Sequence, residues 1–588
     1  MFMRAFTSTS WRRLALFTLL AVVFPAASGR VDFGVCRQNQ ISGAWENVTM
    51  VQNAGRDING RFFPNITAAP AITLEACLLM CGGPGQEPFE WNVFSQQFGA
   101  WLLPYLALVS QLPFGANGRL DNVVSMLLTV GSPTLAAYSL ALTVLNNRWI
   151  VQRFKDLRIS FPNDDKAIRI LSSLQQAPIQ ITSDQSLLAS LVVLPENDEW
   201  WTELAERLDF SSTWSIAAAA SILWVIAAYL LTVVDSFQSL TADLNSNGQG
   251  VGSMWLWLVP VVVSWLQLSP KCDSLKLREA VDRANRIAFA AGADGVAKMG
   301  DLSDEFAVTI DGPYRCSLTR EQERTPPPFN YSRFFSWTLA VEDLAAAFQA
   351  ASERARRHKP VDPSTATTRP WRGRSIDDVH RKGTPEQLMS YCGFESSDRA
   401  HWGPDVFWRM VIASAIALSL QWGTTGAAII VVYSTPTIGL GCRSGAYLLY
   451  GVGGTLVWMM SVVSSALAHY AYPQSHRSWS SPPTSFSHQL AATLSIVLRR
   501  LAKLLAFANA IWILLACIFQ FTNVFDTCWC NTSALQWGKD AFYVFDATDA
   551  LSGMRANWIG AVGLASGCAL LFIAFVNLLN DNDSVLVR

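Results

Sequence analysis

The chain has 588 residues, of which 51% are hydrophobic and only 15% are charged. This composition is too apolar for an ordinary soluble enzyme, and the length exceeds that of one compact domain. The formal net charge of -1 offers no basic excess for nucleic acid, and no zinc-finger or arginine/glycine-rich spacing occurs, so nucleic acid is not an expected partner. We therefore expect an all-α polytopic membrane protein whose constant partner is the lipid bilayer.

The first 29 residues have the three parts of a secretory signal peptide. Arg4, Arg12 and Arg13 precede an apolar run over 14–24, and the small residues PAASG follow it. The run is too short to span a bilayer comfortably. Residues 1–29 are therefore predicted to be a cleaved signal peptide, and residues 30–119 to form a small exterior region.

Seven apolar runs are long enough, or nearly so, to cross about 30 Å of hydrocarbon. In chain order they cover 120–145, 213–234, 252–269, 407–433, 447–470, 504–521 and 557–580. An eighth segment, 98–114, is shorter and contains Pro104 and Pro113. The sequence predicts about seven transmembrane helices, or eight if 98–114 crosses.

The placement of lysine and arginine orients these spans, because cationic loops are retained in the cytosol. If 98–114 does not cross, the loops 146–212, 270–406 and 471–503 and the tail 581–588 share one side. That side holds about 32 Lys and Arg, against about 8 on the other. These loops and the tail are therefore predicted to be cytosolic, and 98–114 to be re-entrant or interfacial.

Glycosylation sequons and cysteines give a second test of the orientation. The sequons at Asn47, Asn65 and Asn531 fall on the predicted exterior, the last in the loop 522–556, whereas the one at Asn330 falls inside and is predicted to be unused. The exterior cysteines, all disulfide candidates, are Cys36, Cys77, Cys81, Cys442, Cys528 and Cys530. Their pairing is open. Because no further metal ligands lie near Cys77 and Cys81, a disulfide is favoured over zinc for them.

The cytosolic loops contain amphipathic helices. Trp200, Trp201, Leu204 and Leu208 lie on one helical face just before a span, which predicts a helix along the membrane surface. Its acidic start, 196–199, is expected to be a solvated helix start and not a carboxylate site.

The large loop 270–406 is predicted to be partly helical and partly disordered, and it is the expected place for a cytosolic protein partner. Helical periodicity covers 276–292 and 337–358, and Pro-rich basic stretches follow. The basic run 354–359 fits anionic lipid, a partner protein or a plain helix C-terminus.

The sequence contains few of the residues and motifs that are typical of catalysis or ion transport. No predicted span interior carries Asp, Glu, Lys or Arg, which argues against an ion-coupled pump. Gln421, Asn509 and Asn577 could line a path, but hydrogen bonding between helices is the favoured use. No hydrolase elbow, Walker lysine or metal-spaced pair among the six histidines occurs. We therefore predict no enzyme, no catalytic or metal residue and no cofactor.

Two glycine groups have alternative interpretations. Gly560, Gly563 and Gly567 allow close helix packing, either within the bundle or in a homodimer. The alternating glycines in NSNGQGVGSMWLWLVP, 245–260, look at first like a phosphate cradle, but no cation occurs over 235–253. They are predicted to form an exterior turn, after which Trp255 and Trp257 anchor in the aromatic belt.

Three stretches carry a resemblance. LASLVVLPENDEWW, NSNGQGVGSMWLWLVP and WLQLSPKCD resemble segments of a family of uncharacterised multi-spanning membrane proteins of filamentous fungi. The resemblance extends from the first span to Asp273 and implies a plasma-membrane or secretory-pathway location, with no activity attached. The expected function is a non-enzymatic surface sensor, receptor or membrane scaffold. The alternative is a transporter or channel-like protein for a neutral or lipidic solute.

Overall fold

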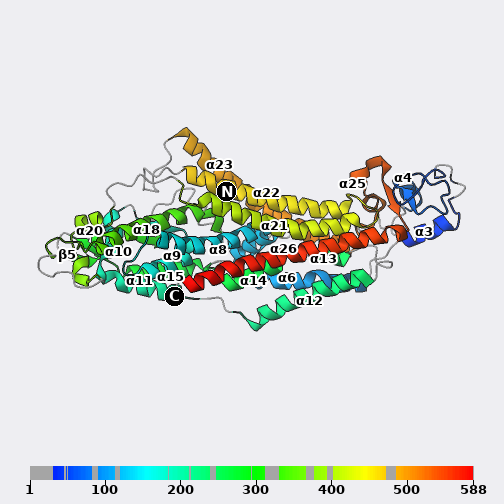
Figure 1. Cartoon of the computed structure of the whole chain (residues 1–588). Coiled ribbons are helices and arrows are strands. Elements are labelled where there is room, and N and C mark those ends of the chain that lie inside the picture. The colour runs from blue at the N-terminus through cyan, green and yellow to red at the C-terminus, as the bar shows by residue number, and fades with distance from the viewer. Residues whose placement is uncertain are drawn as a thin grey trace.

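The computed structural model of the chain describes residues 31–45, 48, 51–81, 91–112, 119–182, 184–210, 214–238, 247–292, 295–310, 330–365, 376–393, 402–471 and 485–586. Within these residues the molecule is elongated, with a bundle of long helices in the middle and a smaller domain at each end (Figure 1). The predicted signal peptide and the sequon asparagine Asn47 lie outside the described residues.

Six long helical segments of the described chain are apolar enough to cross a membrane. They are α12 (Ile216–Gln238), α13 (Asn247–Trp255) continued by α14 (Leu258–Leu268), α21 (Val406–Ser434), α22 (Cys442–Ala471), α23 (Phe486–Phe521) and α26 (Leu551–Leu586). They cover six of the seven predicted runs. A mostly helical chain with several membrane-length helices is therefore confirmed.

The first predicted span, 120–145, is not one straight helix. It consists of α7 (Arg119–Gly131) and α8 (Pro133–Asp156), which are bent by 102° at the break between them. Pro133 cannot donate a backbone hydrogen bond, and the Ser132 hydroxyl accepts from the Leu135 N–H at 3.2 Å as a helix cap. The chain therefore starts a new helix here, and that helix continues past residue 145.

The helix α23 begins well before the predicted span 504–521. Its first half packs on the end of α22, where the Ser464 hydroxyl donates to the Ser495 carbonyl at 2.8 Å. Tertiary packing thus extends the helix through Arg499, whose side chain is 0% exposed. The predicted span 504–521 lies within this helix and contains no charged residue, and Arg499 precedes it.

The predicted exterior turn at the alternating glycines is also wrong. Residues 247–255 form α13, and both Trp255 and Trp257 are fully buried in the bundle rather than facing lipid. A methyl group on Gly248 would lie 2.6 Å from the Trp101 ring, and one on Gly252 would lie 3.1 Å from the Tyr229 ring. The glycines therefore let aromatic rings approach this helix closely.

The weak segment 98–114 packs into the bundle. Its described part comprises the end of α5 (Trp91–Gln97), then η2 (Phe98–Leu102) and α6 (Leu103–Val109), with Leu112 beyond. Leu102 and Leu108 are fully buried, and the Tyr105 hydroxyl donates to the Gly252 carbonyl at 2.9 Å. One face of the segment therefore packs against other helices while Leu103 is exposed on the other face, and both the re-entrant and the interfacial placement stay predictions.

One end of the molecule carries a small domain that we call the cystine domain, residues 31–81 and 522–550. Its sheet has the order β1 (Gly55–Arg56), β2 (Ala71–Thr73), β7 (Phe542–Val544), with antiparallel pairs. Its helices are α3 (Phe33–Ile41), α4 (Leu74–Met80), α24 (Cys528–Asn531) and α25 (Ala534–Trp537). Since β7 comes from the loop 522–556, the two longest predicted exterior segments fold together.

The opposite end carries a larger domain that we call the loop domain, residues 149–210, 271–310 and 330–393. Its helices are α9 (Asp164–Ser173), α10 (Gln185–Val193), α11 (Asp198–Leu208), α15 (Ser274–Asn285), α16 (Met299–Leu302), α18 (Phe334–Arg356) and α20 (Pro385–Tyr391). Two antiparallel pairs complete it: β3 (Ile179–Ile181) with β6 (Val308–Ile310), and β4 (Phe289–Gly292) with β5 (Gly295–Lys298). The two predicted cytosolic loops thus share one core.

The membrane-surface prediction for α11 is wrong. Trp200 and Trp201 are buried in the loop-domain core, and the Trp200 indole donates to Asn285 of α15 at 3.1 Å. An apolar helix face has the same periodicity whether lipid or protein covers it. The sequence pattern alone could not separate these two environments.

The acidic start of α11 forms a clasp between the two loops. Asp198 accepts two hydrogen bonds from Arg381, at 2.8 and 2.6 Å, and Glu196 pairs with Lys382. Arg381 is 2% exposed and also donates to the Val193 carbonyl at 2.8 Å. The acids thus lie at the helix start as expected, with the Asp198 side chain 41% exposed, but Asp198 and Glu196 also form ion pairs that the sequence did not predict.

Replacing Arg381 with alanine should destabilise the loop domain by about 2–4 kcal/mol, because Asp198 and the Val193 carbonyl would lose their charged donor. Asp378→Ala is the matched control, since the Asp378 side chain is 75% exposed and lies 3.8 Å from the same guanidinium. Chemical unfolding of the purified protein, followed by tryptophan fluorescence, measures the difference. Equal midpoints for the two variants would contradict the clasp.

The thiol of Cys392, at the end of α20, should be chemically silent in the folded protein. Burial raises its pKa to about 12, so the reactive thiolate is absent near neutral pH. Because the folded pKa lies above the unfolded one, this thiol's contribution to stability is complete below about pH 8.5 and is lost as the pH rises toward 12. We expect iodoacetamide at pH 8 to modify Cys392 only after denaturation, as read by mass spectrometry; rapid modification of the folded protein would contradict this burial.

Candidate functional site

A buried arginine lies where the helix bundle joins the loop domain. Arg409, in the first turn of α21, is 4% exposed and donates to Asn146 of α8 at 2.6 Å. Its guanidinium lies 3.9 Å from the ring centre of Trp149 and 4.9 Å from that of Phe334. Aromatic faces stabilise a cation that has been removed from water, so this residue ties α21 to α8 and α18.

Further buried side chains extend the contact, and we call the whole set the polar junction. Asn146 donates to Gln175 at 3.1 Å, and Asn330 donates to Thr143 at 3.0 Å. The Ser139 hydroxyl donates to Asn330 at 2.9 Å. The chain of bonds connects α8 to η3 (Leu174–Gln176) and η5 (Asn330–Ser332). Every member is buried, so the junction is a fixed coupling between bundle and domain.

The junction holds no acid–base pair that would serve catalysis. Cys272 lies near Arg333 at its edge, and burial raises the pKa of this thiol far above its usual range. Arg333 donates to the Gln176 carbonyl. Within the described residues no group of three or more His, Cys, Asp or Glu side chains could hold a metal ion.

Arg409 lies at the edge of the predicted span 407–433, but the sequence does not reveal its partners. Asn146 and Gln175 belong to the loop predicted as 146–212, and Asn330 belongs to 270–406. No pattern in those loops marks them, since isolated amides are common in loops. The Asn330 sequon proves to be buried in the junction, so this amide is not accessible for a glycan.

A second polar group surrounds the break between α7 and α8. Gln421 accepts from the Thr134 N–H at 3.0 Å, Asn509 donates to the Gly131 carbonyl at 2.8 Å, and the Tyr450 hydroxyl donates to the Val130 carbonyl at 2.7 Å. These bonds satisfy the backbone groups that a broken helix leaves open. Gln421 and Asn509 therefore act between helices, as the sequence favoured, whereas Asn577 is half-buried on α26.

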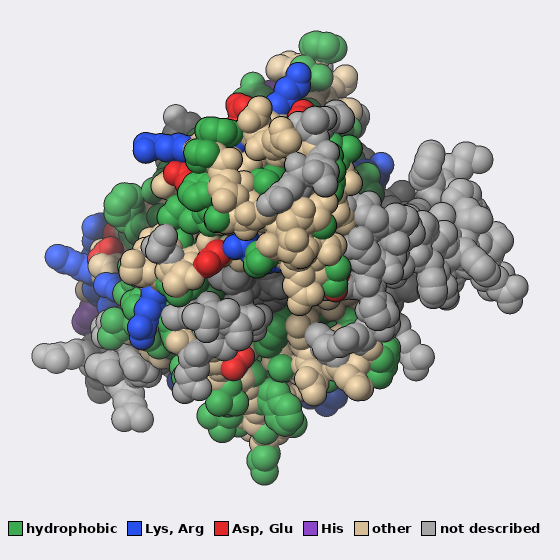
Figure 2. Space-filling view, turned by 90° about the vertical axis from the view of Figure 1, so that its right-hand side faces the viewer, with side chains coloured by type: hydrophobic (Ala, Val, Ile, Leu, Met, Phe, Trp, Pro, Cys, Tyr) green, Lys and Arg blue, Asp and Glu red, His purple; other side chains and the backbone are tan. Residues whose placement is uncertain are grey.

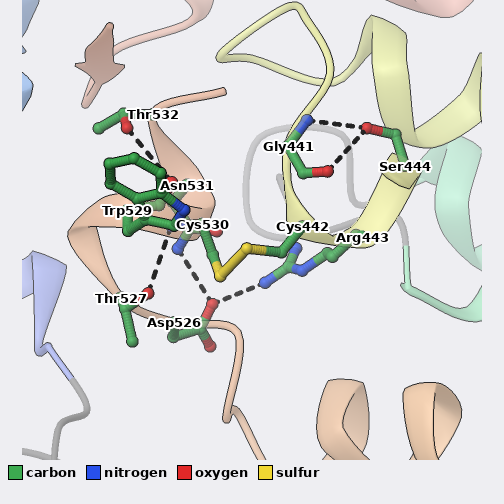
Figure 3. The surroundings of a disulfide bond; sticks show 10 residues. All are labelled: Gly441, Cys442, Arg443, Ser444, Asp526, Thr527, Trp529, Cys530, Asn531 and Thr532. Carbon is green, nitrogen blue, oxygen red and sulfur yellow. Dashed lines mark hydrogen bonds and ion pairs between the residues drawn. A yellow bond between two sulfur atoms is a disulfide. The ribbon is translucent and has the colours of Figure 1, made fainter. Parts of the chain in front are cut away.

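All six candidate cysteines lie in disulfides at the cystine-domain end. The pairs are Cys36–Cys81, Cys77–Cys528 and Cys442–Cys530. Cys77 and Cys81 bond to different partners, which leaves no metal pair between them. Figure 3 shows the third disulfide, beside which Arg443 donates to Asp526 at 2.6 Å and fixes the start of α22 to the loop 522–556.

The described sequons at this end differ in their surroundings. Asn65 is exposed, and its side chain accepts from the Thr67 hydroxyl at 2.7 Å. Asn531 is half-buried and donates to Asp526 at 3.1 Å, while the Ser533 hydroxyl of its sequon donates to the buried Thr437 carbonyl at 2.7 Å. Asn65 is thus the accessible acceptor in the folded protein; glycosylation at either residue stays a prediction.

The glycines of the predicted packing motif do not pack within the bundle. A methyl group on Gly560, Gly563 or Gly567 would meet nothing within 4 Å. By contrast, one on Gly453 would lie 2.7 Å from Asn509, and one on Gly454 would lie 2.8 Å from Gln421. The close helix packing is therefore made by the glycines of α22. The face of α26 that carries the other three has no neighbour in the described chain, and a homodimer there stays a prediction.

Comparison with known proteins identifies no relative: no family, no curated protein and no solved structure matches this chain.

Proposed function

We propose that the chain is a multi-pass membrane sensor whose cystine domain faces the exterior and whose loop domain faces the cytosol. The orientation is supported by the excess of Lys and Arg in the loops that build the loop domain. It is also supported by the disulfides at the other end, since disulfides persist in oxidising compartments. The observation that carries the sensing role is the polar junction, which couples the bundle to the loop domain.

The mechanism follows from the connections. A ligand or partner that shifts the exterior end of α21 or α22 moves helices that run the length of the bundle. At the other end of α21, Arg409 donates to Asn146 and lies over the Trp149 ring. A displacement of α21 must therefore move α8 and α18 with it, or it must break these buried contacts. Packed interfaces of this kind switch between discrete arrangements. The role is non-enzymatic, with a cytosolic partner on the loop domain.

The test has two parts. Epitopes inserted in 311–329 and in 522–556 should be reached by antibodies from the cytosolic and the exterior side respectively, in selectively permeabilised cells. Hydrogen exchange then tests coupling: mild reduction of the exterior disulfides should change protection in α18 and α8, in the wild type but less in Asn146→Ala. An exterior 311–329 epitope would overturn the orientation, and unchanged exchange in α18 would overturn the coupling.

The break between α7 and α8 favours a second candidate function, transport of a neutral or lipidic solute. Discontinuous helices at mid-bundle form the binding sites of many transporters. Here the groups at the break are occupied by Gln421, Asn509 and Tyr450, which supports a structural role. Measuring solute flux into proteoliposomes that contain the purified protein distinguishes a transporter from a sensor. A sensor should give no flux above that of empty vesicles.

A further inference from the structure

Four polar side chains gather between α12, α13 and α26, in the half of the bundle nearer the cystine domain. Gln249 and Ser253 are one turn apart on α13 and fully buried, and Tyr229 of α12 is buried beside them. The hydroxyls of Ser253 and of Ser566 on α26 lie next to the Tyr229 hydroxyl. Gln249 is tied to α26 by a hydrogen bond, because its Nε2 donates to the Trp558 carbonyl at 3.3 Å.

One of these buried atoms, Gln249 Oε1, has no hydrogen-bond partner within the described residues, and two hydroxyls beside it contact only each other and Ser566 without a hydrogen bond of good geometry. The two hydroxyls are those of Ser253 and Tyr229. Leaving such an atom without a partner costs about 1–3 kcal/mol, so native proteins almost always supply a water or a ligand. At the α7–α8 break, by contrast, Gln421 and Asn509 are bonded to backbone groups. The open acceptor Gln249 Oε1, with the poorly bonded hydroxyls beside it, therefore points to an occupant of this site.

The chemistry of the site selects an uncharged occupant. The surrounding stretches 216–234, 247–268 and 556–580 contain no Asp, Glu, Lys or Arg. A charged group placed here would have no counter-ion at membrane depth. Gln249 offers an acceptor, and the three hydroxyls can each donate or accept. This set fits a hydroxyl or a carbonyl group.

The two outer walls of the site face lipid. In the most apolar stretch of each helix, only 22% of the residues of α12 and 28% of those of α26 are buried. The corresponding share for the stretch through α13 and α14 is 83%. Leu230 and Leu231 of α12 are exposed, as are Ile559 and Leu564 of α26. The lowest part of the view in Figure 2, at the height of α12 in Figure 1, is largely hydrophobic. A ligand with an apolar body can thus keep that body in hydrocarbon.

We propose that Gln249, Ser253, Tyr229 and Ser566 bind the hydroxyl or carbonyl headgroup of an uncharged amphiphile that enters from the lipid phase between α12 and α26. The inference rests on the proposed membrane placement and names the class of ligand that the sensor detects. Binding would alter the contact of α12 with α13, and α13 packs against α21, whose other end carries Arg409.

The test uses the full chain in lipid nanodiscs and two photoreactive, alkyne-tagged probes: a long-chain alcohol and the fatty acid of the same length. At pH 8 the alcohol should label peptides from 216–238 or 551–580, and untagged alcohol should compete. The ionised fatty acid should label these peptides more than tenfold less, because its charge has no partner in the site. Equal labelling by both probes would overturn the proposal.

Substitutions of the four polar side chains test whether they bind the headgroup of the ligand. Tyr229→Phe and Ser253→Ala together should weaken competition by the untagged alcohol about tenfold, since each removes one hydroxyl. Tyr447→Phe is the matched control, because that buried hydroxyl donates to Gln520 at 2.5 Å and is not one of the four proposed ligand groups. If the double variant does not fold, the half-buried Ser566→Ala should still lose affinity several-fold. Unchanged affinity in a folded variant overturns the ligand site alone, whereas a cytosolic 522–556 epitope overturns the proposed function.

Discussion

Arg409→Ala should destabilise the protein by about 2–4 kcal/mol, because it leaves buried partners without their charged donor. The substitution removes the donor to Asn146 at 2.6 Å and a guanidinium 3.9 Å from the ring centre of Trp149. Both partners are buried, so water cannot replace the lost contacts without opening the junction. The apparent unfolding temperature of the detergent-solubilised protein, followed by size-exclusion chromatography after heating, measures the loss.

Two comparisons sharpen this result. Lys155→Ala is the matched control, because Lys155 is an exposed cation on the same helix as Asn146 and should change stability little. Combining Arg409→Ala with Asn146→Ala should cost less than the sum of the single changes, since the two residues share one hydrogen bond. Strict additivity would show that Arg409 and Asn146 are not coupled.

Cutting the chain once between residues 311 and 329 should leave its two halves covalently joined. Cys77–Cys528 links residues 451 apart and crosses the cut, whereas Cys36–Cys81 lies wholly before it and Cys442–Cys530 wholly after it. An engineered protease site in this segment should therefore give one band on a non-reducing gel and two bands after reduction.

The variant Cys77→Ser should give two bands under both conditions. Loss of this disulfide should also lower the stability of the cystine domain by about 2–5 kcal/mol, because the unfolded chain gains freedom. Trypsin resistance of residues 31–81 on intact cells reports that loss, and Cys568→Ser serves as the control because Cys568 is a free thiol. A wild-type chain that separates without reductant would refute the pairing.

Most of the helical plan could be predicted from local pattern. Apolar length identified α12, α21, α22 and α26, and helical periodicity identified α18, because both features depend on residues close in the chain. The segregation of Lys and Arg predicted which loops would lie together, and the loop domain is built from those loops. The six disulfide-bonded cysteines were identified as a set, although their pairing was not.

Contacts between distant residues decided the rest. Ser132 caps α8 and donates to the carbonyl of Gly454, a partner 322 residues away, so the broken first span has no local signature beyond Pro133. The buried face of α11 and the buried glycines of α13 have the same patterns that lipid-facing helices and turns show. Periodicity and hydropathy record what a segment prefers locally. Only the tertiary structure decides whether lipid, water or another part of the chain satisfies that preference, because the partner is brought in by folding.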